Sequence, residues 1–321
     1  MRSDRLLISE DIYLNEERRK KLKIKQLGKK NVCKIKYSLK CDPEVVYISF
    51  DGLEQTGIVK QCFTTRLGGI SQGEFSTMNL SYTRGDTKEA VDENYRRVAT
   101  VLSCDVNDFV CSHQTHTTNV KKVSSADGGK GVTRERDFSD IDGLITNEPG
   151  VVLATFYADC VPLYIVDPVH KAIGLSHSGW RGTVQKMGKV TLEAMAKEYG
   201  TKPEDVRVAI GPSICQECYE VSEDVALAFL EAFPEDMEKE EQYAKHYQDG
   251  KMENCLCYQK ANGKYQLNLW YANYRVFRDA GVPDNQIEIT DICTCCNPDF
   301  LFSHRASHGK RGNLGAFLTL K

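Results

Sequence analysis

Two histidines and a cysteine lie at positions where a protein could hold a reactive centre. His116 follows the apolar run DFVC, Cys160 interrupts the run from residue 150 to 167, and His177 ends the run KAIGLSH. Each run is typical of a buried strand, and side chains near strand ends often line a pocket. Two imidazoles and a thiolate form a three-ligand zinc set with an open fourth position, as in catalytic zinc sites.

The spacing of these residues leaves their chemistry open. They are spread over about sixty positions without a compact metal-binding signature. The spacing is therefore explained equally well by a metal site and by a buried cysteine with hydrogen-bonded histidines. The Cys160 thiolate could also act as a nucleophile, with His116 or His177 as its base. Both functional interpretations use the same side chains, so the sequence predicts the site and leaves its mechanism undecided.

Asp159 precedes Cys160 within the same apolar run. A buried carboxylate is costly unless it is paired or takes part in chemistry, so Asp159 is our candidate acid, base or ligand-orienting group. In a regular strand, Asp159 and Cys160 would point to opposite faces unless the strand ends or bulges there.

Seven further cysteines form three groups in the second half of the chain. The groups are Cys215-x-x-Cys218, Cys255-x-Cys257 and Cys293-x-Cys295-Cys296. The first two groups could together form a structural four-cysteine zinc site, although the 36 residues between them exceed the usual spacing. The third group is ambiguous. Because buried cysteine commonly behaves as a small apolar residue, we interpret all three groups as free, partly buried thiols.

Hydrophobic periodicity predicts the elements that position these residues. Helical spacing covers residues 88–103, 185–200, 222–233 and 269–281. Runs typical of strands cover residues 108–116, 142–147, 150–167, 171–179 and 206–212, and the C-terminal segment returns to strand and loop. Strands outnumber helices early and do not alternate strictly with them, which favours an α+β fold with a mixed sheet. The chain has no dinucleotide-binding or phosphate-loop motif.

Composition and charge exclude several classes of protein. The 321 residues carry 42 basic and 45 acidic side chains, so the net charge of −3 gives no bias toward nucleic acid. No apolar run approaches the roughly 18 residues of a membrane-spanning helix, and the charged N-terminus does not resemble a secretory signal. The thirteen cysteines, an odd number, predict free thiols in a reducing cytoplasm.

Residues 1–55 differ in sequence character from the rest of the chain and are predicted to be an N-terminal extension. Eleven lysines and arginines lie between Arg18 and Lys40 without an acidic residue. We interpret this basic segment as a solvated helix followed by an exposed strand, because it nearly lacks the aromatic residues of an RNA-binding surface. A docking surface for a partner is the alternative.

Eight segments resemble the laccase-domain family, also called multicopper polyphenol oxidase proteins. The matching segments are FTTRLGGIS with MNL (63–80), HQTHTTNV (113–120), IDGLITN (141–147), ADCVPLYIVDP (158–168), IGLSHSGWRGTV (173–184), AIGPSICQECYEV (209–221), LWYANYRVFRDAGV (269–282) and CTCCNPDFLFSHR (293–305). They follow the order of the family. The resemblance therefore implies a single laccase-domain-type catalytic domain over residues 56–321.

This resemblance implies purine nucleoside phosphorylase and adenosine deaminase activities. It also implies a metal site at His116 of QTH, Cys160 of ADC and His177 of HSGWRG. The family fold is an α+β mixed β-sandwich flanked by helices, similar to the cysteine-dependent deamidase domains of necrotizing toxins. That similarity keeps the cysteine hydrolase alternative open. The chain departs from the family pattern at Ser178, where alanine is frequent, and at Asn268, where aspartate is frequent.

Copper oxidase chemistry fits these residues less well than zinc chemistry. A multicopper oxidase needs a mononuclear copper and a three-copper cluster, which together require more histidines than the seven of this chain. Copper could still occupy the same site, because it binds nitrogen and sulfur ligands tightly. Zinc lowers the pKa of a bound water toward neutrality, which supports displacement of ammonia from purine C6.

We therefore expect a zinc-dependent purine nucleoside phosphorylase that splits adenosine, inosine and S-methyl-5′-thioadenosine and also deaminates adenosine. Arg66, Arg181 and Arg305 are candidate phosphate or substrate clamps, because guanidinium groups bind such oxygens bidentately. Asn79 and Gln114 are candidates for contact with ribose or base. The expected partners are purine nucleosides and phosphate, without nucleic acid or membrane, and the expected state is a monomer or weak homodimer.

Overall fold

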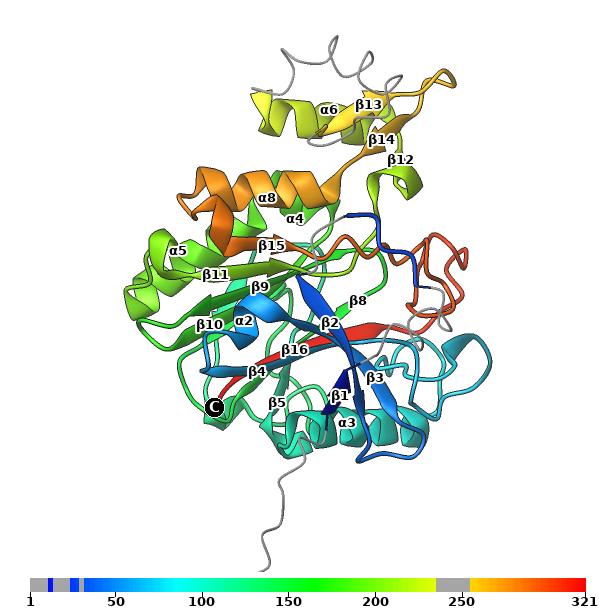
Figure 1. Cartoon of the computed structure of the whole chain (residues 1–321), viewed down its shortest axis with the longest axis vertical. Helices are drawn as coiled ribbons and strands as arrows, with labels where there is room; N and C mark the ends of the chain where they lie inside the picture. Colours follow the sequence, from blue (N-terminus) through cyan, green and yellow to red (C-terminus); the bar gives the residue numbers. More distant parts are fainter. Residues whose placement is uncertain (1–10, 14–23, 29–31, 235–254) are drawn as a thin grey trace, which may run out of the picture.

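Two mixed β-sheets lie face to face, and helices cover their outer surfaces (Figure 1). The computed structural model describes residues 11–13, 24–28, 32–234 and 255–321. Helix α3 (Lys88–Leu102) lies on one side, and helices α5 (Met187–Tyr199) and α8 (Leu269–Asp279) lie on the other side beyond the second sheet. A smaller sheet and helix α6 (Glu223–Ala232) lie at the far end, next to α8 (Figure 1). The chain is thus a mixed α/β protein with several sheets and few helices.

The first sheet has seven strands. In spatial order they are β1 (Asp11–Tyr13), β2 (Cys33–Ser38), β3 (Val45–Phe50), β4 (Val59–Thr64), β16 (Leu314–Leu320), β8 (Val152–Tyr157) and β5 (Phe109–Cys111). Only the β5–β8 pair in this order is parallel. The C-terminal strand β16 therefore lies in the middle of the sheet and joins the early strands to β8.

The second sheet has six strands and the third has three. The second consists of β15 (Ile287–Ile289), β11 (Arg207–Ile210), β9 (Val161–Asp167), β10 (Ala172–Ser178), β7 (Gly143–Thr146) and β6 (Val120–Lys122). The third consists of β12 (Glu220–Val221), β14 (Tyr265–Leu267) and β13 (Cys257–Gln259). The described helices are α2 (Asp51–Glu54), α3 (Lys88–Leu102), α4 (Trp180–Val184), α5 (Met187–Tyr199), α6 (Glu223–Ala232) and α8 (Leu269–Asp279).

Both faces of the central strands are buried, which explains their continuous apolar sequence. In β9, Tyr164 and Val166 belong to the core between the two sheets, whereas Leu163 and Ile165 belong to the core beneath the helices. Successive side chains of a strand point to opposite faces, so a strand covered on both sides needs apolar residues at every position.

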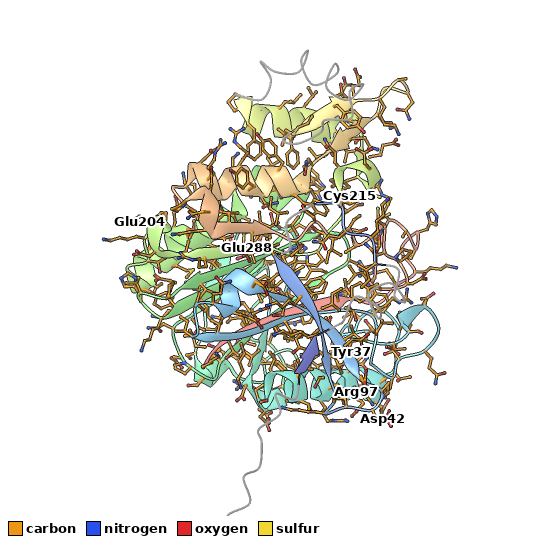
Figure 2. The ribbon with its side chains drawn as sticks, viewed as in Figure 1. Tyr37, Asp42, Arg97, Glu204, Cys215 and Glu288 are labelled. Atoms are coloured by element: carbon orange, nitrogen blue, oxygen red, sulfur yellow. The ribbon has the colours of Figure 1, made fainter. Side chains whose placement is uncertain are left out.

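Helix α3 confirms the helix predicted over 88–103 and packs on the outer face of the first sheet. The Thr87 hydroxyl accepts a hydrogen bond from the Ala90 amide and caps the start of the helix. On the buried side, the Arg97 guanidinium donates hydrogen bonds to the carbonyls of Asp42, Pro43 and Gly68. Figure 2 shows Arg97 next to Asp42, where the helix meets the turn between β2 and β3.

The other three predicted helices are also confirmed, with one boundary changed. Helices α6 and α8 match the predictions over 222–233 and 269–281. The predicted helix over 185–200 begins at Met187, because Lys186 has a left-handed backbone with φ of 61° and separates α5 from the short α4.

The described part of residues 33–55 belongs to the first sheet. Strand β2 pairs with β3 over six residues, and β3 pairs with β4. The prediction of an exposed strand in the basic segment is wrong: Ile35 is 2% exposed and Lys36 is 8% exposed. A boundary at residue 55 would therefore separate strands of one sheet. The predicted helix in the basic segment lies mostly outside the described residues.

The run from residue 150 to 167 forms two strands that belong to different sheets. Strand β8 ends at Tyr157 in the first sheet, and β9 begins at Val161 in the second. The strand therefore ends where Asp159 interrupts the apolar run. Asp159 has a left-handed φ of 88°, which turns the chain from one sheet to the other.

In the described part of the chain, no helix combines the length and the apolar composition needed to cross a membrane.

Candidate metal centre

The three predicted ligands come from different elements and meet where the two sheets adjoin. Cys160 lies in the crossing from β8 to β9, and His177 lies near the end of β10. His116 lies in the loop that follows β5 and has a left-handed φ of 67°. The donor atoms of these three residues all lie within 4.8 Å of one another. The structure therefore brings together the set selected from the sequence.

The centre is closed on one side and open on the other. His177 is 4% exposed, Cys160 is partly buried and His116 is exposed. The His116 and His177 rings lie edge to face with centroids 4.9 Å apart, and Cys160 Sγ lies 3.9 Å from His116 Nε2. A metal ion held by these donors would be reachable from solvent on the His116 side, as a catalytic position requires.

Asp142 orients this centre and was not selected from the sequence. Its Oδ1 lies 2.8 Å from His177 Nδ1, and the carboxylate is fully buried just before β7. An ionised carboxylate only accepts hydrogen bonds, so His177 donates from Nδ1 and its Nε2 is directed toward the centre. The sequence contained this residue in IDGLITN, where an Asp-Gly pair before a strand is typical of a turn.

The same carboxylate shapes the loop that carries His116. Asp142 accepts hydrogen bonds from the backbone amides of Thr115, His116 and Thr117, at 2.9–3.1 Å. Burial raises the pKa of Asp142, but the hydrogen bond from His177 and those from the backbone outweigh burial and lower it. One ionised side chain thus fixes both histidine ligands.

The thiol and the buried imidazole stabilise each other's charged forms. Burial raises the pKa of Cys160, but the charge of His177 and the hydrogen bond from His116 outweigh it and lower the pKa to about 6. Burial lowers the pKa of His177, but the Cys160 thiolate and Asp142 raise it to about 9. A thiolate is the form of cysteine that binds metals and attacks electrophiles.

Gly179 allows the close approach of the ligands. A Cβ at this position would lie 2.8 Å from His116 Cδ2 and 3.2 Å from Cys160 Sγ. Its φ of −75° is ordinary, so contact with the ligands, and not backbone conformation, excludes a side chain here.

Asp159 lies beside the centre, where both of its carboxylate oxygens accept hydrogen bonds. Thr294 Oγ1 donates to Oδ1 at 2.7 Å, and the Arg305 backbone amide donates to Oδ2 at 2.7 Å. The carboxylate that orients His177 is Asp142. The remaining role predicted for Asp159, as acid or base, stays a prediction.

The charge of Arg311 is within electrostatic reach of Asp159 and Cys160. Arg311 is 9% exposed, and its buried Nε has no hydrogen-bond partner among the described residues. Burial and the neighbouring charge of Arg84 lower the pKa of Arg311 to about 10, against the opposing effect of Asp159 and Cys160. Burial, followed by the charge of Arg311, also lowers the pKa of His304. A buried guanidinium with an unused donor is suited to an anionic ligand.

Arg66 lies in the same region as Arg311. Both line a hollow of about 130 Å³ that Lys310 also lines. The Arg66 guanidinium stacks on Phe302 and donates hydrogen bonds to the carbonyls of Ser76 and Pro298. The structure thus places one predicted clamp, Arg66, in the same hollow as Arg311, which was not among the predicted clamps.

Arg305 lies over a half-buried aromatic ring, Tyr219, whereas the Arg181 guanidinium lies 4.4 Å from the Trp180 ring centroid. The Arg305 guanidinium lies 5.6 Å from the Tyr219 ring centroid and donates hydrogen bonds to the carbonyls of Cys218 and Glu220. Burial and, to a smaller extent, the charge of Cys160 raise the pKa of Tyr219, whereas the charges of Arg305 and Arg181 act to lower it. Tyr219 therefore lies within electrostatic reach of the centre and was not selected from the sequence.

Asn79 and Gln114 hold loops in place. Asn79 is fully buried, and its amide contacts Ser81, Asp86 and the Asn313 backbone amide. Gln114 bonds to both the amide and the carbonyl of Phe156 and thereby fastens the His116 loop to the end of β8. These contacts favour supporting roles, and the predicted contacts with ribose or base stay predictions.

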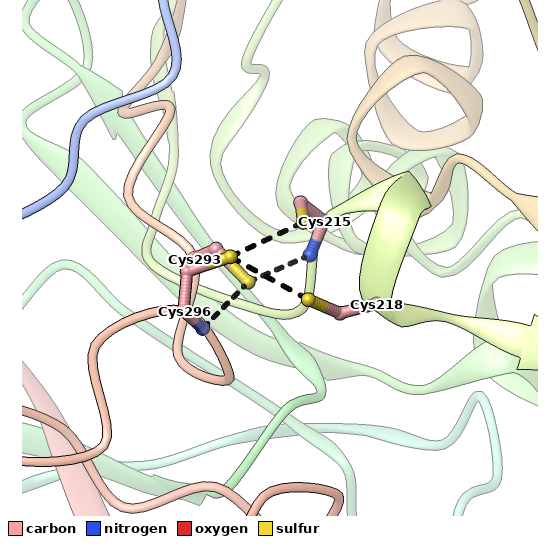
Figure 3. Close-up of side chains that lie close together, drawn as sticks. All are labelled: Cys215, Cys218, Cys293 and Cys296. Atoms are coloured by element: carbon pink, nitrogen blue, oxygen red, sulfur yellow. Dashed lines mark hydrogen bonds between the residues drawn. The ribbon is translucent and has the colours of Figure 1, made fainter.

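The cysteine groups assemble differently from the pairing considered in the sequence. Cys215 and Cys218 lie with Cys293 and Cys296, and the donor atoms of all four lie within 4.8 Å of one another (Figure 3). The pairing of Cys215 and Cys218 with the group at residues 255–257 is therefore wrong.

The fold and the site define a mixed α/β protein with an open centre of two histidines and one cysteine between two sheets. A family model described as "Multi-copper polyphenol oxidoreductase laccase" matches residues 60–321. The chain belongs to this family, and the resemblance in the sequence is confirmed.

Its relatives carry names from nucleoside chemistry. The chain is 34% identical over 260 residues to purine nucleoside phosphorylase YlmD of Bacillus subtilis. The aligned region covers 81% of this chain and 87% of the relative. It is 30% identical to adenosine deaminase RL5 of an unknown prokaryotic organism, over 76% of this chain and 88% of the relative. The crystal structure of YlmD from Geobacillus stearothermophilus superposes with a TM-score of 0.74 at 31% identity, over 86% and 96% of the two chains.

The described residues fit a single bound metal better than the several coppers in the family description. Within the described ranges, two groups of side chains could hold a metal ion, namely the histidine–cysteine centre and the four cysteines. Neither group contains the several histidines that a three-copper cluster needs. The nitrogen and sulfur donors of the first group, with Asp142 behind His177, suit zinc in a mononuclear site.

Proposed function

We propose that the chain is a zinc-dependent purine nucleoside phosphorylase that also deaminates adenosine. The observation that carries this proposal is the open centre of His116, Cys160 and His177, with a buried, incompletely bonded cation, Arg311, within electrostatic reach of Cys160. Relatives named for phosphorolysis and for deamination support the same reading. The proposed substrates are adenosine, inosine and S-methyl-5′-thioadenosine, with phosphate as the second substrate.

Different residues of the chain would bind the phosphate and the purine. Phosphate would bind in the hollow of about 130 Å³ between Arg66 and Arg311, since guanidinium groups bind its oxygens bidentately. The purine would lie against the Tyr219 ring, with Arg181 and Arg305 at its edge. These placements would set the anion and the nucleoside side by side near the centre.

In phosphorolysis, a phosphate oxygen would form a bond to C1′ of the ribose while the bond from C1′ to purine N9 breaks. The departing purine must gain a proton, and Asp159 is our candidate for the residue that transfers it. In deamination, water would add at purine C6 and ammonia would leave. A bound zinc ion would act as a Lewis acid in this chemistry, and His116, Cys160 and His177 would hold it.

Chromatography of adenosine incubated with metal-quantified protein, with and without phosphate, tests the proposal. Adenine release that depends on phosphate, or inosine formation without phosphate, would support it and show which reaction dominates. Unchanged adenosine in both incubations, from folded protein with zinc bound, would contradict it.

A cysteine hydrolase is the second candidate, because the lowered pKa of Cys160 and the raised pKa of His177 describe a thiolate–imidazolium pair. The proposed similarity to toxin deamidase domains belongs to this reading. A chelator separates the two candidates, because removal of the metal should silence a zinc enzyme and leave a Cys–His enzyme active. We also propose a reducing, cytoplasmic setting, in which cysteines stay reduced and can bind metal.

A further inference from the structure

Four cysteines from two distant segments converge outside the candidate metal centre (Figure 3). Cys215 and Cys218 lie before β12, and Cys293 and Cys296 lie in the loop after β15. Both pairs have the form Cys-x-x-Cys, although 74 residues separate Cys218 from Cys293. Two Cys-x-x-Cys segments that face each other are typical of structural zinc sites.

The sulfur atoms have the spacing of ligands around one metal ion. Cys218 Sγ lies 3.5 Å from Cys296 Sγ, and Cys215 Sγ lies 4.0 Å from Cys296 Sγ. Zinc–sulfur bonds of about 2.3 Å in a tetrahedron place the sulfurs about 3.8 Å apart. The observed distances lie on either side of this value, and two of the four side chains are buried.

Two backbone amides point at one of these sulfurs. The amides of Cys215 and Cys296 donate to Cys293 Sγ at 3.2 and 3.4 Å. A neutral thiol is a weak acceptor, whereas a metal-bound thiolate accepts such bonds well and is oriented by them. Backbone bonds also join the segments: Thr294 donates from its amide to Ser213, and Ser213 donates to Ile292.

We propose that Cys215, Cys218, Cys293 and Cys296 bind a structural zinc ion. Four thiolates in tetrahedral geometry select zinc and leave no open position, so this ion would have no part in the chemistry. The proposal does not depend on which reaction the protein performs.

The zinc would fix the loops beside the candidate metal centre. Thr294, between two of the cysteines in sequence, donates to Asp159, the residue before Cys160. The carbonyl of Cys218 accepts from the Arg305 guanidinium. A metal that joins the two loops would therefore hold Asp159 and Arg305 in place.

Zinc analysis of the full chain, purified under reducing conditions, tests the proposal. If zinc binds at both centres, we expect about two zinc ions per chain in the wild type and about one in Cys160→Ala. In the Cys160→Ala protein, X-ray absorption should show four sulfur neighbours at about 2.3 Å. The double variant Cys218→Ser, Cys296→Ser should lose the same ion and unfold at a lower temperature.

Cys295→Ser and Cys257→Ser are matched controls that should keep the wild-type zinc content. Cys160→Ala protein without zinc would overturn the proposal, and so would a disulfide between Cys218 and Cys296 found by mass spectrometry without reduction. The Cys160→Ala arm keeps all four cysteines, so it decides the question even where the double variant fails to fold.

Discussion

The buried carboxylate of Asp142 holds both histidine ligands of the candidate metal centre in position. It accepts a hydrogen bond from His177 and three from backbone amides around His116. We expect Asp142→Asn to weaken zinc binding at the candidate centre by about 10- to 100-fold, as is usual when a carboxylate behind a ligand histidine is lost. Zinc titration against a competing chelator measures this change.

Asp140→Asn is the matched control for Asp142→Asn, because Asp140 is exposed and bonds to the Thr115 hydroxyl. It should leave zinc affinity unchanged. Equal affinities for the wild type and Asp142→Asn would show that the carboxylate does not orient the ligands.

A methyl group added at Gly179 should disturb the ligands directly. The new Cβ of Gly179→Ala would lie 2.8 Å from the His116 ring, closer than side chains tolerate. We expect a folded protein with weakened zinc binding and little activity. Gly182→Ala, in the same helix region with its nearest contact at 3.6 Å, should retain both. Comparable zinc binding in the two variants would contradict this account.

Arg311 should separate the two proposed reactions. A hydrogen bond to a charged group contributes about 1.5–3 kcal/mol, so Arg311→Met should raise the KM for phosphate about 10- to 100-fold. Deamination of adenosine does not use phosphate and should change much less. Arg134→Met, in a different surface hollow, is the control. Parallel losses of both activities would indicate a general structural role for Arg311.

At the scale of elements, the sequence was informative wherever the signal was local. The apolar spacing in 88–103 predicted α3, and the apolar run over 150–167 predicted strand, although it left open whether the strand ends or bulges at Asp159. Signals that depend on distant partners were not recoverable. Cys218 and Cys296 meet only because β15 lies beside β11, and a local reading compared Cys218 with the nearer Cys255. Arg311 was likewise not selected as a clamp, because its burial depends on the folded chain.

The turn between β9 and β10 provides a prediction about pH. Asp167 is fully buried and accepts hydrogen bonds from the Val169 and His170 amides and from His170 Nδ1. Burial raises the pKa of Asp167, but hydrogen bonds, including those from His170, outweigh it and lower the pKa below 3.8. A carboxylate with a lowered pKa stabilises the fold above its unfolded pKa, and this contribution is lost as the pH falls through the folded value.

We expect Asp167→Asn to lower the free energy of unfolding by about 1–3 kcal/mol at pH 7. The difference from the wild type should shrink as the pH falls below 3.8, because the wild-type carboxyl then becomes protonated. Urea denaturation at several pH values measures it, and Asp299→Asn, an exposed position, serves as control. A difference that stays constant with pH would assign the effect to packing instead of charge.

At the scale of the whole molecule, the centre depends on how the two sheets meet. Cys160 reaches it only because the chain crosses from β8 in the first sheet to β9 in the second. His177 lies in β10, Asp142 directly precedes the neighbouring strand β7 of the second sheet, and Gln114 ties the His116 loop to β8 of the first. The relative position of the two sheets therefore sets the ligand geometry. A change that unfolds the first sheet should also disrupt the metal centre.

Removing residues 1–55 tests this dependence. The deletion removes β2 and β3, leaves the edge of β4 unpaired and takes away the buried Ile35, Ile48, Phe50 and Leu53. Each such side chain contributes about 1.5–3 kcal/mol, and together they approach the usual 5–15 kcal/mol stability of a domain. We expect chain 56–321 to aggregate or remain unfolded in size-exclusion chromatography and circular dichroism, whereas chain 32–321, which keeps both strands, should fold and bind zinc. A folded, active 56–321 chain would show that residues 33–55 are an addition to a self-sufficient domain, since the sheet would then tolerate β4 as its edge.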